Sequence, residues 1–138
     1  MGRKRRGIPI HGWLIIDKPS GISSNNVVGR IRSATNAAKV GHGGTLDPLA
    51  TGILPLAMGE ATKTVSYAMD AIKEYRFTIR WGEARNTDDR EGVVTETCNL
   101  RPSKEQIIEA LKHFIGDIEQ TPPAFSAIKI GGMRAYEL

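Results

Sequence analysis

The residues most suggestive of chemistry lie between positions 41 and 52, in the stretch GHGGTLDPLATG. Four glycines, one proline and two threonines surround a single acid, Asp47, and a single histidine, His42. A carboxylate held in a fixed position can act as a nucleophile or as a general base. Glycine permits backbone conformations closed to other residues, and Pro48 restricts the backbone of the residue before it. The stretch therefore predicts a loop that presents one carboxylate to a ligand.

A purely structural role for the same acid is the alternative. Asp47 followed by Pro48 is a good pair for the cap and first position of a helix, so Asp47 could simply cap a helix beginning at Pro48. The residue types alone do not choose between a cap and a catalyst.

Several other kinds of site do not fit the chain. A phosphate-binding P-loop needs glycine directly followed by Lys-Ser or Lys-Thr, and the chain has no such sequence. A dinucleotide fingerprint starting at Gly41 would need glycine at position 46, which is leucine. The single cysteine, Cys98, excludes an internal disulfide, and the three histidines are scattered. The residues therefore argue against these phosphate, dinucleotide and zinc sites.

The first half of the chain predicts elements that could position the loop. The apolar run from Trp13 to Ile16 predicts a short buried strand that ends in a turn. Residues 23–35 begin with capping residues and place Val27, Val28 and Ile31 on one face, which predicts a helix. A second helix is predicted from about Ala61 to Ala68.

The second half predicts a hairpin and a helix. Residues 74–81 alternate strictly, with Tyr75 first on the apolar face, and predict a strand that pairs with residues 93–97 in a long-looped hairpin. Residues 103–116 predict a helix that opens with a capping box of Ser and Gln and ends at glycine. The last segment reads as a strand, a Gly-Gly turn and the first turn of a helix. Mixed helices and antiparallel hairpins indicate an α+β fold.

Charge and hydropathy narrow the class of partner. The net charge of +4 equals the four positives of one short run, Arg3, Lys4, Arg5 and Arg6, because the other 15 Lys and Arg balance 15 acids. A basic arm over residues 1–10 suits a polyanion, with a solvated terminus as the alternative. No run of 18 apolar residues and no signal-peptide core occurs, so we expect a cytoplasmic protein that does not span a membrane.

The loop and its surroundings resemble one enzyme family. Residues 41–63, GHGGTLDPLATGILPLAMGEATK, resemble the aspartate motif of TruB-type tRNA pseudouridine synthases. The segments GWLIIDKPSGISSNNVV, KEYRFTIRWG, TDDREG and GGMRAYEL are similar to further family motifs in the same order. The resemblance implies that residues 11–138 are the N-terminal part of a pseudouridine synthase catalytic domain. The implied fold is α+β, with a mixed, mainly antiparallel sheet and flanking helices.

The resemblance also implies an activity and roles for individual residues. The reaction is isomerisation of the T-loop uridine of tRNA, position 55, to pseudouridine, without cofactor, metal or obligate protein partner. Asp47 would be the catalytic aspartate, either attacking the ribose anomeric carbon or assisting formation of a glycal. Substrate-binding roles fall to Tyr75 (stacking on the flipped uracil), His42 (entering the T loop) and Lys63 (near a phosphate).

Each of these assignments has a structural alternative. Tyr75 could be a core residue of its strand, His42 a loop histidine bonded to backbone, and Lys63 a solvated helix lysine. Arg3, Lys4, Arg5 and Arg6 fit contacts with tRNA phosphates. The resemblance further suggests a structural role for Asp17 and Lys18.

The chain also lacks features that the family has. A later K-G-x-Y-x-R motif, whose arginine pairs with the catalytic aspartate, and a C-terminal PUA domain have no counterpart in these 138 residues. We therefore expect residues 1–138 alone to be inactive. Two other functions stay open, a guide-RNA-dependent relative of the dyskerin type and a non-catalytic RNA-binding or RNA-folding module.

Overall fold

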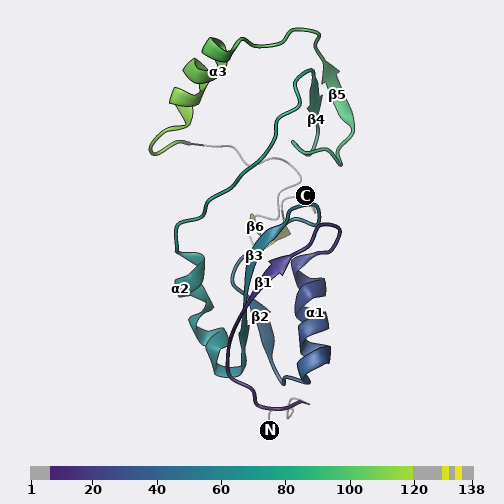
Figure 1. Ribbon diagram of the computed structural model, residues 1–138, viewed down its shortest axis with the longest axis vertical. Coiled ribbons are helices and arrows are strands. Elements are labelled where there is room, and N and C mark those ends of the chain that lie inside the picture. Colours follow the sequence, from purple (N-terminus) through teal and green to yellow (C-terminus); the bar gives the residue numbers. More distant parts are fainter. Residues whose placement is uncertain (1–6, 120–128, 131–132, 135–138) are drawn as a thin grey trace. The chain divides into compact units, whose positions relative to one another are not determined.

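The computed structural model describes residues 7–119, 129–130 and 133–134, and these fall into two compact units that divide after Tyr75 (Figure 1). The basic run from Arg3 to Arg6 and residues 135–138 of the expected C-terminal helical turn lie outside the described residues.

The first unit is built on a three-stranded antiparallel sheet. Its strands are β1 (Gly12–Lys18), β2 (Val40–His42) and β3 (Gly52–Met58), in the order β1-β3-β2. The sheet confirms the strand predicted from Trp13 to Ile16 and extends it at both ends, but the strand is not buried as predicted, since Trp13 is 39% and Ile15 64% exposed. The central strand β3 follows directly from the glycine-rich loop, so the loop is tied to the middle of the sheet.

Helix α1 (Ser24–Thr35) covers one face of this sheet (Figure 1). It begins as predicted, because the Ser23 side chain accepts a hydrogen bond from the Asn26 backbone N–H and so satisfies a donor that the helix leaves open. Three buried side chains, Val27 of α1 with Leu54 and Leu56 of β3, form the centre of the core. The partly buried apolar residues packed against them are Leu14, Ile16, Ile22, Val28, Ile31, Val40 and Leu46.

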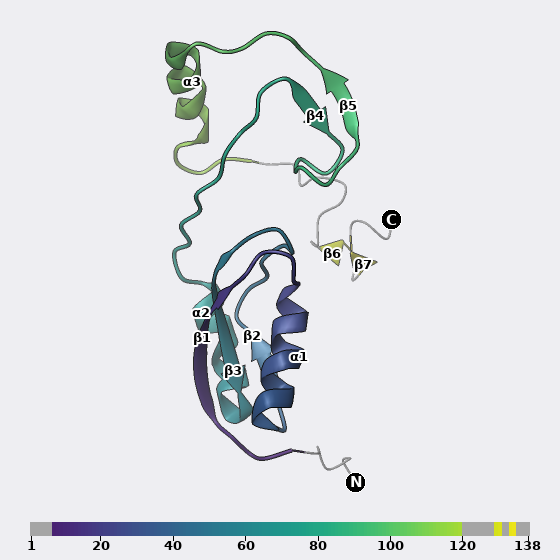
Figure 2. The ribbon, with the colours of Figure 1, turned by 45° about the vertical axis from the view of Figure 1, so that its right-hand side comes forward.

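The helical segment after β3 lies on the other side of the sheet from α1 (Figures 1 and 2). The helix predicted from about Ala61 to Ala68 is confirmed only in part, since the chain forms a 3₁₀ turn, η1 (Gly59–Thr64), before the short helix α2 (Val65–Met69). Helix α2 lies close to Gly43. A Cβ atom built on Gly43 would lie 3.6 Å from the Ala68 Cβ and 3.7 Å from the Pro55 Cβ.

The second unit holds short elements separated by irregular segments. Strands β4 (Glu83–Arg85) and β5 (Val94–Thr97) form an antiparallel pair, followed by helix α3 (Lys104–Leu111) and the 3₁₀ turn η2 (Lys112–Phe114). A further antiparallel pair joins β6 (Lys129–Ile130) to β7 (Met133–Arg134). The predicted capping box is confirmed, with both the Ser103 and the Gln106 hydrogen bonds present.

The strand predicted over residues 74–81 is wrong. The chain has no regular structure from residue 73 to residue 80, and the hairpin begins instead after Gly82, at Glu83. An alternating pattern describes a surface that fits a sheet, but the strand forms only where a neighbouring strand supplies ladder hydrogen bonds. Within the described residues nothing pairs with this segment, and the Phe77 side chain is 77% exposed.

The fold class itself is confirmed, because helices combine with sheets whose described ladders are all antiparallel. An isolated parallel bridge joins Ile8 to Ala37. Within the part of the chain that the structure describes, no helix has both the length and the apolar character needed to cross a membrane.

Candidate functional site

Asp47 lies in the connection between β2 and β3, and its side chain is exposed. The Ala50 backbone N–H donates to the Asp47 carbonyl at 3.1 Å, which closes a four-residue turn rather than a helix. The alternative in which Asp47 caps a helix beginning at Pro48 is therefore wrong.

The carbonyls that such a helix would need are already in use. The Pro48 carbonyl accepts from the Gly21 backbone N–H at 2.8 Å and from the Lys18 ammonium at 3.2 Å. The Leu49 carbonyl accepts from the Ser20 hydroxyl at 3.0 Å. A helix would pair each carbonyl with the N–H four residues ahead. These contacts to residues 18–21 replace that ladder and hold the turn against the end of β1.

Lys18 is the largest polar contributor to this arrangement. It is fully buried, and its ammonium donates to the carbonyls of Pro19 at 3.0 Å, Ile22 at 2.8 Å and Pro48 at 3.2 Å. An ammonium has three N–H donors, so all of them find acceptors, as a buried charge requires. This geometry agrees with the structural role expected for Lys18, which joins the turn after β1 to the turn after Asp47.

Ser24 holds the other side of Asp47. Its side chain is almost completely buried, and its hydroxyl accepts from the Leu46 backbone N–H at 2.9 Å and donates to the Leu46 carbonyl at 3.0 Å. The backbone is thus held by residues 18–24 on both sides of Asp47, at Leu46 and at Pro48. The Asp47 carboxylate itself accepts no hydrogen bond from any residue that the structure describes, so a fixed backbone presents an exposed acid.

His42 lies closer to the sheet than expected. It is the last residue of β2 and pairs with Leu56 of β3, whereas the sequence placed it in a loop. Its Nδ1 atom is buried and has no hydrogen-bond partner among the described residues, so the predicted bond to backbone is not formed by that atom. A buried polar atom without a partner is uncommon in native proteins.

Lys63 and Tyr75 are both exposed. Lys63 lies in η1 and forms an ion pair with Glu60, whose pKa is lowered mainly by the hydrogen bond from Lys63. Tyr75, the last residue of the first unit, is 68% exposed, so its placement in the core of a strand is wrong. The structure thus puts Asp47, His42, Lys63 and Tyr75 on one unit, with the first two in neighbouring stretches of the chain.

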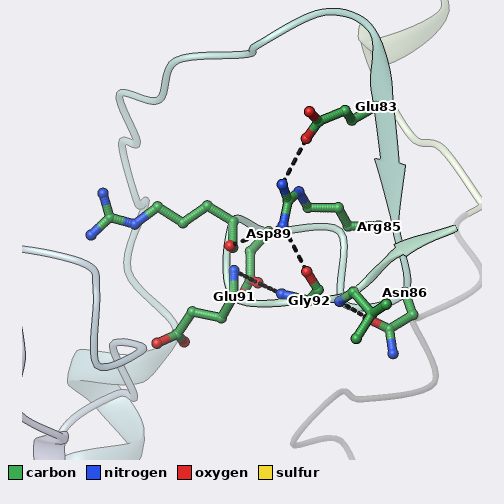
Figure 3. Close-up of polar contacts among 8 residues, drawn as sticks. Glu83, Arg85, Asn86, Asp89, Glu91 and Gly92 are labelled. Atoms are coloured by element: carbon green, nitrogen blue, oxygen red, sulfur yellow. Dashed lines mark hydrogen bonds and ion pairs between the residues drawn. The ribbon is translucent and has the colours of Figure 1, made fainter. Parts of the chain in front are cut away.

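Hydrogen bonds among its own residues close the charged loop between β4 and β5 (Figure 3). One carboxylate oxygen of Asp89 accepts from the Thr87 hydroxyl at 2.6 Å and from the backbone N–H groups of Glu91 at 2.8 Å and Gly92 at 3.3 Å. These bonds stabilise the ionised form, and the Thr87 bond contributes most to lowering the pKa of Asp89.

Arg85 closes the same loop from the strand side. Its guanidinium donates to the Gly92 carbonyl at 2.7 Å and pairs with Glu83 at 2.6 Å, and this hydrogen bond lowers the pKa of Glu83 (Figure 3). Within the described residues, no group of three or more His, Cys, Asp or Glu side chains is placed to hold a metal ion.

Sequence reasoning missed Ser20 and Ser24 as supports of the loop. One signal could have found Ser24. Two serines stand together at positions 23 and 24, and a helix uses only one residue as its cap. The second hydroxyl needed another partner, but only the tertiary structure identifies that partner as Leu46.

The comparisons with known proteins agree on one family. Residues 32–138 match the family model described as TruB family pseudouridylate synthase (N terminal domain). The chain is 60% identical over 138 residues to tRNA pseudouridine synthase B of Rhodospirillum rubrum, covering all of this chain and 45% of that protein. It is also 60% identical over 136 residues to tRNA pseudouridine synthase B of Dinoroseobacter shibae, covering 99% of this chain and 45% of that protein.

One solved structure overlaps part of the chain. It is described as the structure of an H/ACA RNP bound to a substrate RNA containing 2'-deoxyuridine. The matched chain is 35% identical, with a TM-score of 0.40, and the match covers 49% of this chain and 24% of that one.

Proposed function

The chain belongs to the TruB family of pseudouridylate synthases, and from this premise we propose that the full-length protein isomerises a uridine of tRNA to pseudouridine. The chain spans about 45% of the length of the relatives from R. rubrum and D. shibae, so the activity is proposed for the whole protein. The substrate is the T-loop uridine, recognised within the T-stem-loop. A cytoplasmic location follows from that substrate.

The reaction needs one well-placed carboxylate and no net redox change. The bond between N1 of uracil and the ribose anomeric carbon breaks, the base turns, and C5 of the base bonds to that carbon. The proton leaves C5 and N1 gains one, so substrate and product are isomers. The Asp47 carboxylate serves this sequence by adding to the anomeric carbon or by assisting glycal formation, and both routes require it beside a nucleotide taken out of its stack.

The single observation that carries the proposal is the way Asp47 is presented. The backbone of the residues on either side of it is fixed, at Leu46 by Ser24 and at Pro48 by Lys18, while its carboxylate stands exposed without a partner among the described residues. An acid with only a capping role would be bonded to backbone N–H groups. A fixed backbone and an open carboxylate suit a group that must meet a substrate in one orientation.

The other assigned residues complete the proposal. Exposed Tyr75 stacks on the flipped uracil, and His42, which is partly buried, enters the space that the base leaves. Lys63 contacts a phosphate once it exchanges its exposed ion pair with Glu60, which costs little because surface pairs are weak. Arg3, Lys4, Arg5 and Arg6 add contacts to the tRNA backbone.

An assay of pseudouridine formation in a T-stem-loop RNA tests the proposal. The full-length wild type should convert the T-loop uridine, and Asp47→Asn should lower the single-turnover rate constant by about 10²–10⁴-fold or more while RNA binding persists. Asp70→Asn, which alters another exposed acid of the same unit, should leave the rate unchanged. Residues 1–138 alone should give little or no product.

Three outcomes would contradict the proposal. Undiminished turnover by Asp47→Asn would remove Asp47 from the reaction. Product that forms only when a guide RNA is added would place the protein in a guide-dependent class. RNA binding without product from any variant, the wild type included, would leave an RNA-binding module.

A further inference from the structure

We propose that Ser24 is a positioning residue for Asp47, acting through the backbone of Leu46. The inference rests on the proposed function, because it concerns how the catalytic carboxylate is aimed. Ser24 does not itself contact the carboxylate. It sets the peptide group from which the carboxylate projects.

The geometry of the contact is unusual for a serine at the start of a helix. The hydroxyl of Ser24 reaches across 22 positions of sequence and bonds to both polar backbone groups of one residue, accepting from Leu46 N–H at 2.9 Å and donating to Leu46 C=O at 3.0 Å. Two bonds to one residue restrict rotation as well as distance. Since Leu46 directly precedes Asp47, the bonds fix the direction in which the chain enters the turn.

Helix capping does not account for Ser24. The cap of α1 is Ser23, whose side chain accepts from the Asn26 N–H at 3.2 Å. Ser24 is the first helical residue, is 2% exposed, and directs its hydroxyl to the loop. Neighbouring serines therefore divide two tasks, one starting the helix and the other holding the loop.

The backbone after Asp47, at Pro48 (the far side), has more hydrogen-bond partners from distant residues than the backbone before it, at Leu46 (the near side). On the far side the Pro48 carbonyl has two donors, Lys18 and the Gly21 backbone N–H, so loss of one leaves the other. On the near side Ser24 is the only described residue that bonds to the Leu46 backbone groups. Removing the Ser24 hydroxyl should therefore release the near side while the far side stays attached.

Such a release should impair the chemical step more than substrate binding. The Leu46 N–H and C=O would lose their partners in a partly buried position, and the loop would shift to reach others. A displacement of about 1 Å at a reacting group can lower a rate by about 10²-fold. We expect Ser24→Ala to lower the single-turnover rate constant by about tenfold or more and to leave RNA affinity within about threefold of wild type.

The experiment uses the full-length protein and a T-stem-loop RNA, with Ser23→Ala as the matched control. Both variants remove one hydroxyl at the start of α1, but only Ser24→Ala breaks the bonds to Leu46. Ser24→Cys is a second lesion, because the thiol fills the space and hydrogen-bonds weakly. Rates are measured well below the melting temperature of every variant, and amide exchange of Leu46 is followed by NMR.

The expected result is a rate loss in Ser24→Ala and Ser24→Cys, with faster Leu46 amide exchange, and neither effect in Ser23→Ala. Equal rates in Ser24→Ala and Ser23→Ala would overturn the proposal, as would a rate loss that follows RNA affinity. Should Ser24→Ala fail to fold, full activity in a folded Ser24→Cys has the same force. The proposed function is tested separately: it holds if the wild type forms pseudouridine and Asp47→Asn does not.

Discussion

The two units of the chain both combine helices with antiparallel strands, and they differ in burial. In the first unit Leu54 and Leu56 are essentially inaccessible to solvent, and even a lysine, Lys18, is enclosed. In the second unit, by contrast, Leu111 is 56% exposed and Phe114 is 69% exposed. All the buried hydrophobic residues of the described chain belong to the first unit.

The difference separates what neighbours in sequence can do from what distant residues must do. The capping box of α3 and the Asp89 turn form fully in the second unit, because each needs partners only two or three residues away. The Asp47 turn instead depends on Lys18 and Ser24, which lie 30 and 22 positions from their partners Pro48 and Leu46. The fixed backbone around Asp47 is therefore found where a core has formed.

The largest expected loss of stability comes from shortening a side chain in the core of the first unit. In the 138-residue chain, Leu54→Ala should lower the free energy of unfolding by about 2–5 kcal/mol, because it removes a fully buried side chain and leaves a cavity. The matched change Leu111→Ala, on the exposed face of α3, should cost less than about 0.5 kcal/mol. Urea unfolding followed by circular dichroism measures both. Equal losses of unfolding free energy in the two variants would contradict the difference in burial between the units.

A second change tests whether a buried polar side chain contributes more to stability than an exposed one. Lys18→Met should lower the free energy of unfolding by about 2–4 kcal/mol, because it leaves the partly buried hydrogen bonds to the carbonyls of Pro19 and Ile22 without their donor. Lys63→Met removes an exposed lysine with one surface ion pair and should cost less than about 0.5 kcal/mol. Thermal and urea unfolding provide the measurement. A stable Lys18→Met protein would show that the ammonium is not needed to hold the turn.

The smallest expected effect is the response of the Asp89 turn to a fall in pH. Because hydrogen bonds hold the folded pKa of Asp89 below its ordinary value of 3.8, its contribution is fully present above that value and is lost as pH falls through the folded pKa. The backbone N–H resonances of Glu91 and Gly92 should therefore move together in NMR spectra as the solution is acidified below about pH 4. Asp89→Asn should remove this titration.

Asp88→Asn is the control for the acid titration, because Asp88 has a positive φ of 56° that asparagine also tolerates. The Glu91 and Gly92 resonances should titrate in this variant as in the wild type. Titration that persists in Asp89→Asn would assign the change to another carboxyl group.

Local patterns in the sequence determined much of the fold. The caps at Ser23 and Ser103 and the apolar face of α1 depend on residues within one or two helical turns, and all three were predicted correctly. The strand over residues 74–81 was predicted wrongly, since alternation cannot supply a pairing partner. The mixed α+β class followed from the same patterns, and the family from the residues around Asp47.

The sequence by itself thus determined that one acid, Asp47, stands in a glycine-rich loop, and it left open whether that acid caps a helix. Only the tertiary structure decided the matter, by engaging the Pro48 carbonyl with Lys18 and the Leu46 backbone with Ser24. The physical reason is that a backbone group bonds to whichever donor or acceptor the fold brings within reach. Such contacts across 22 to 30 positions leave no periodic trace in the sequence.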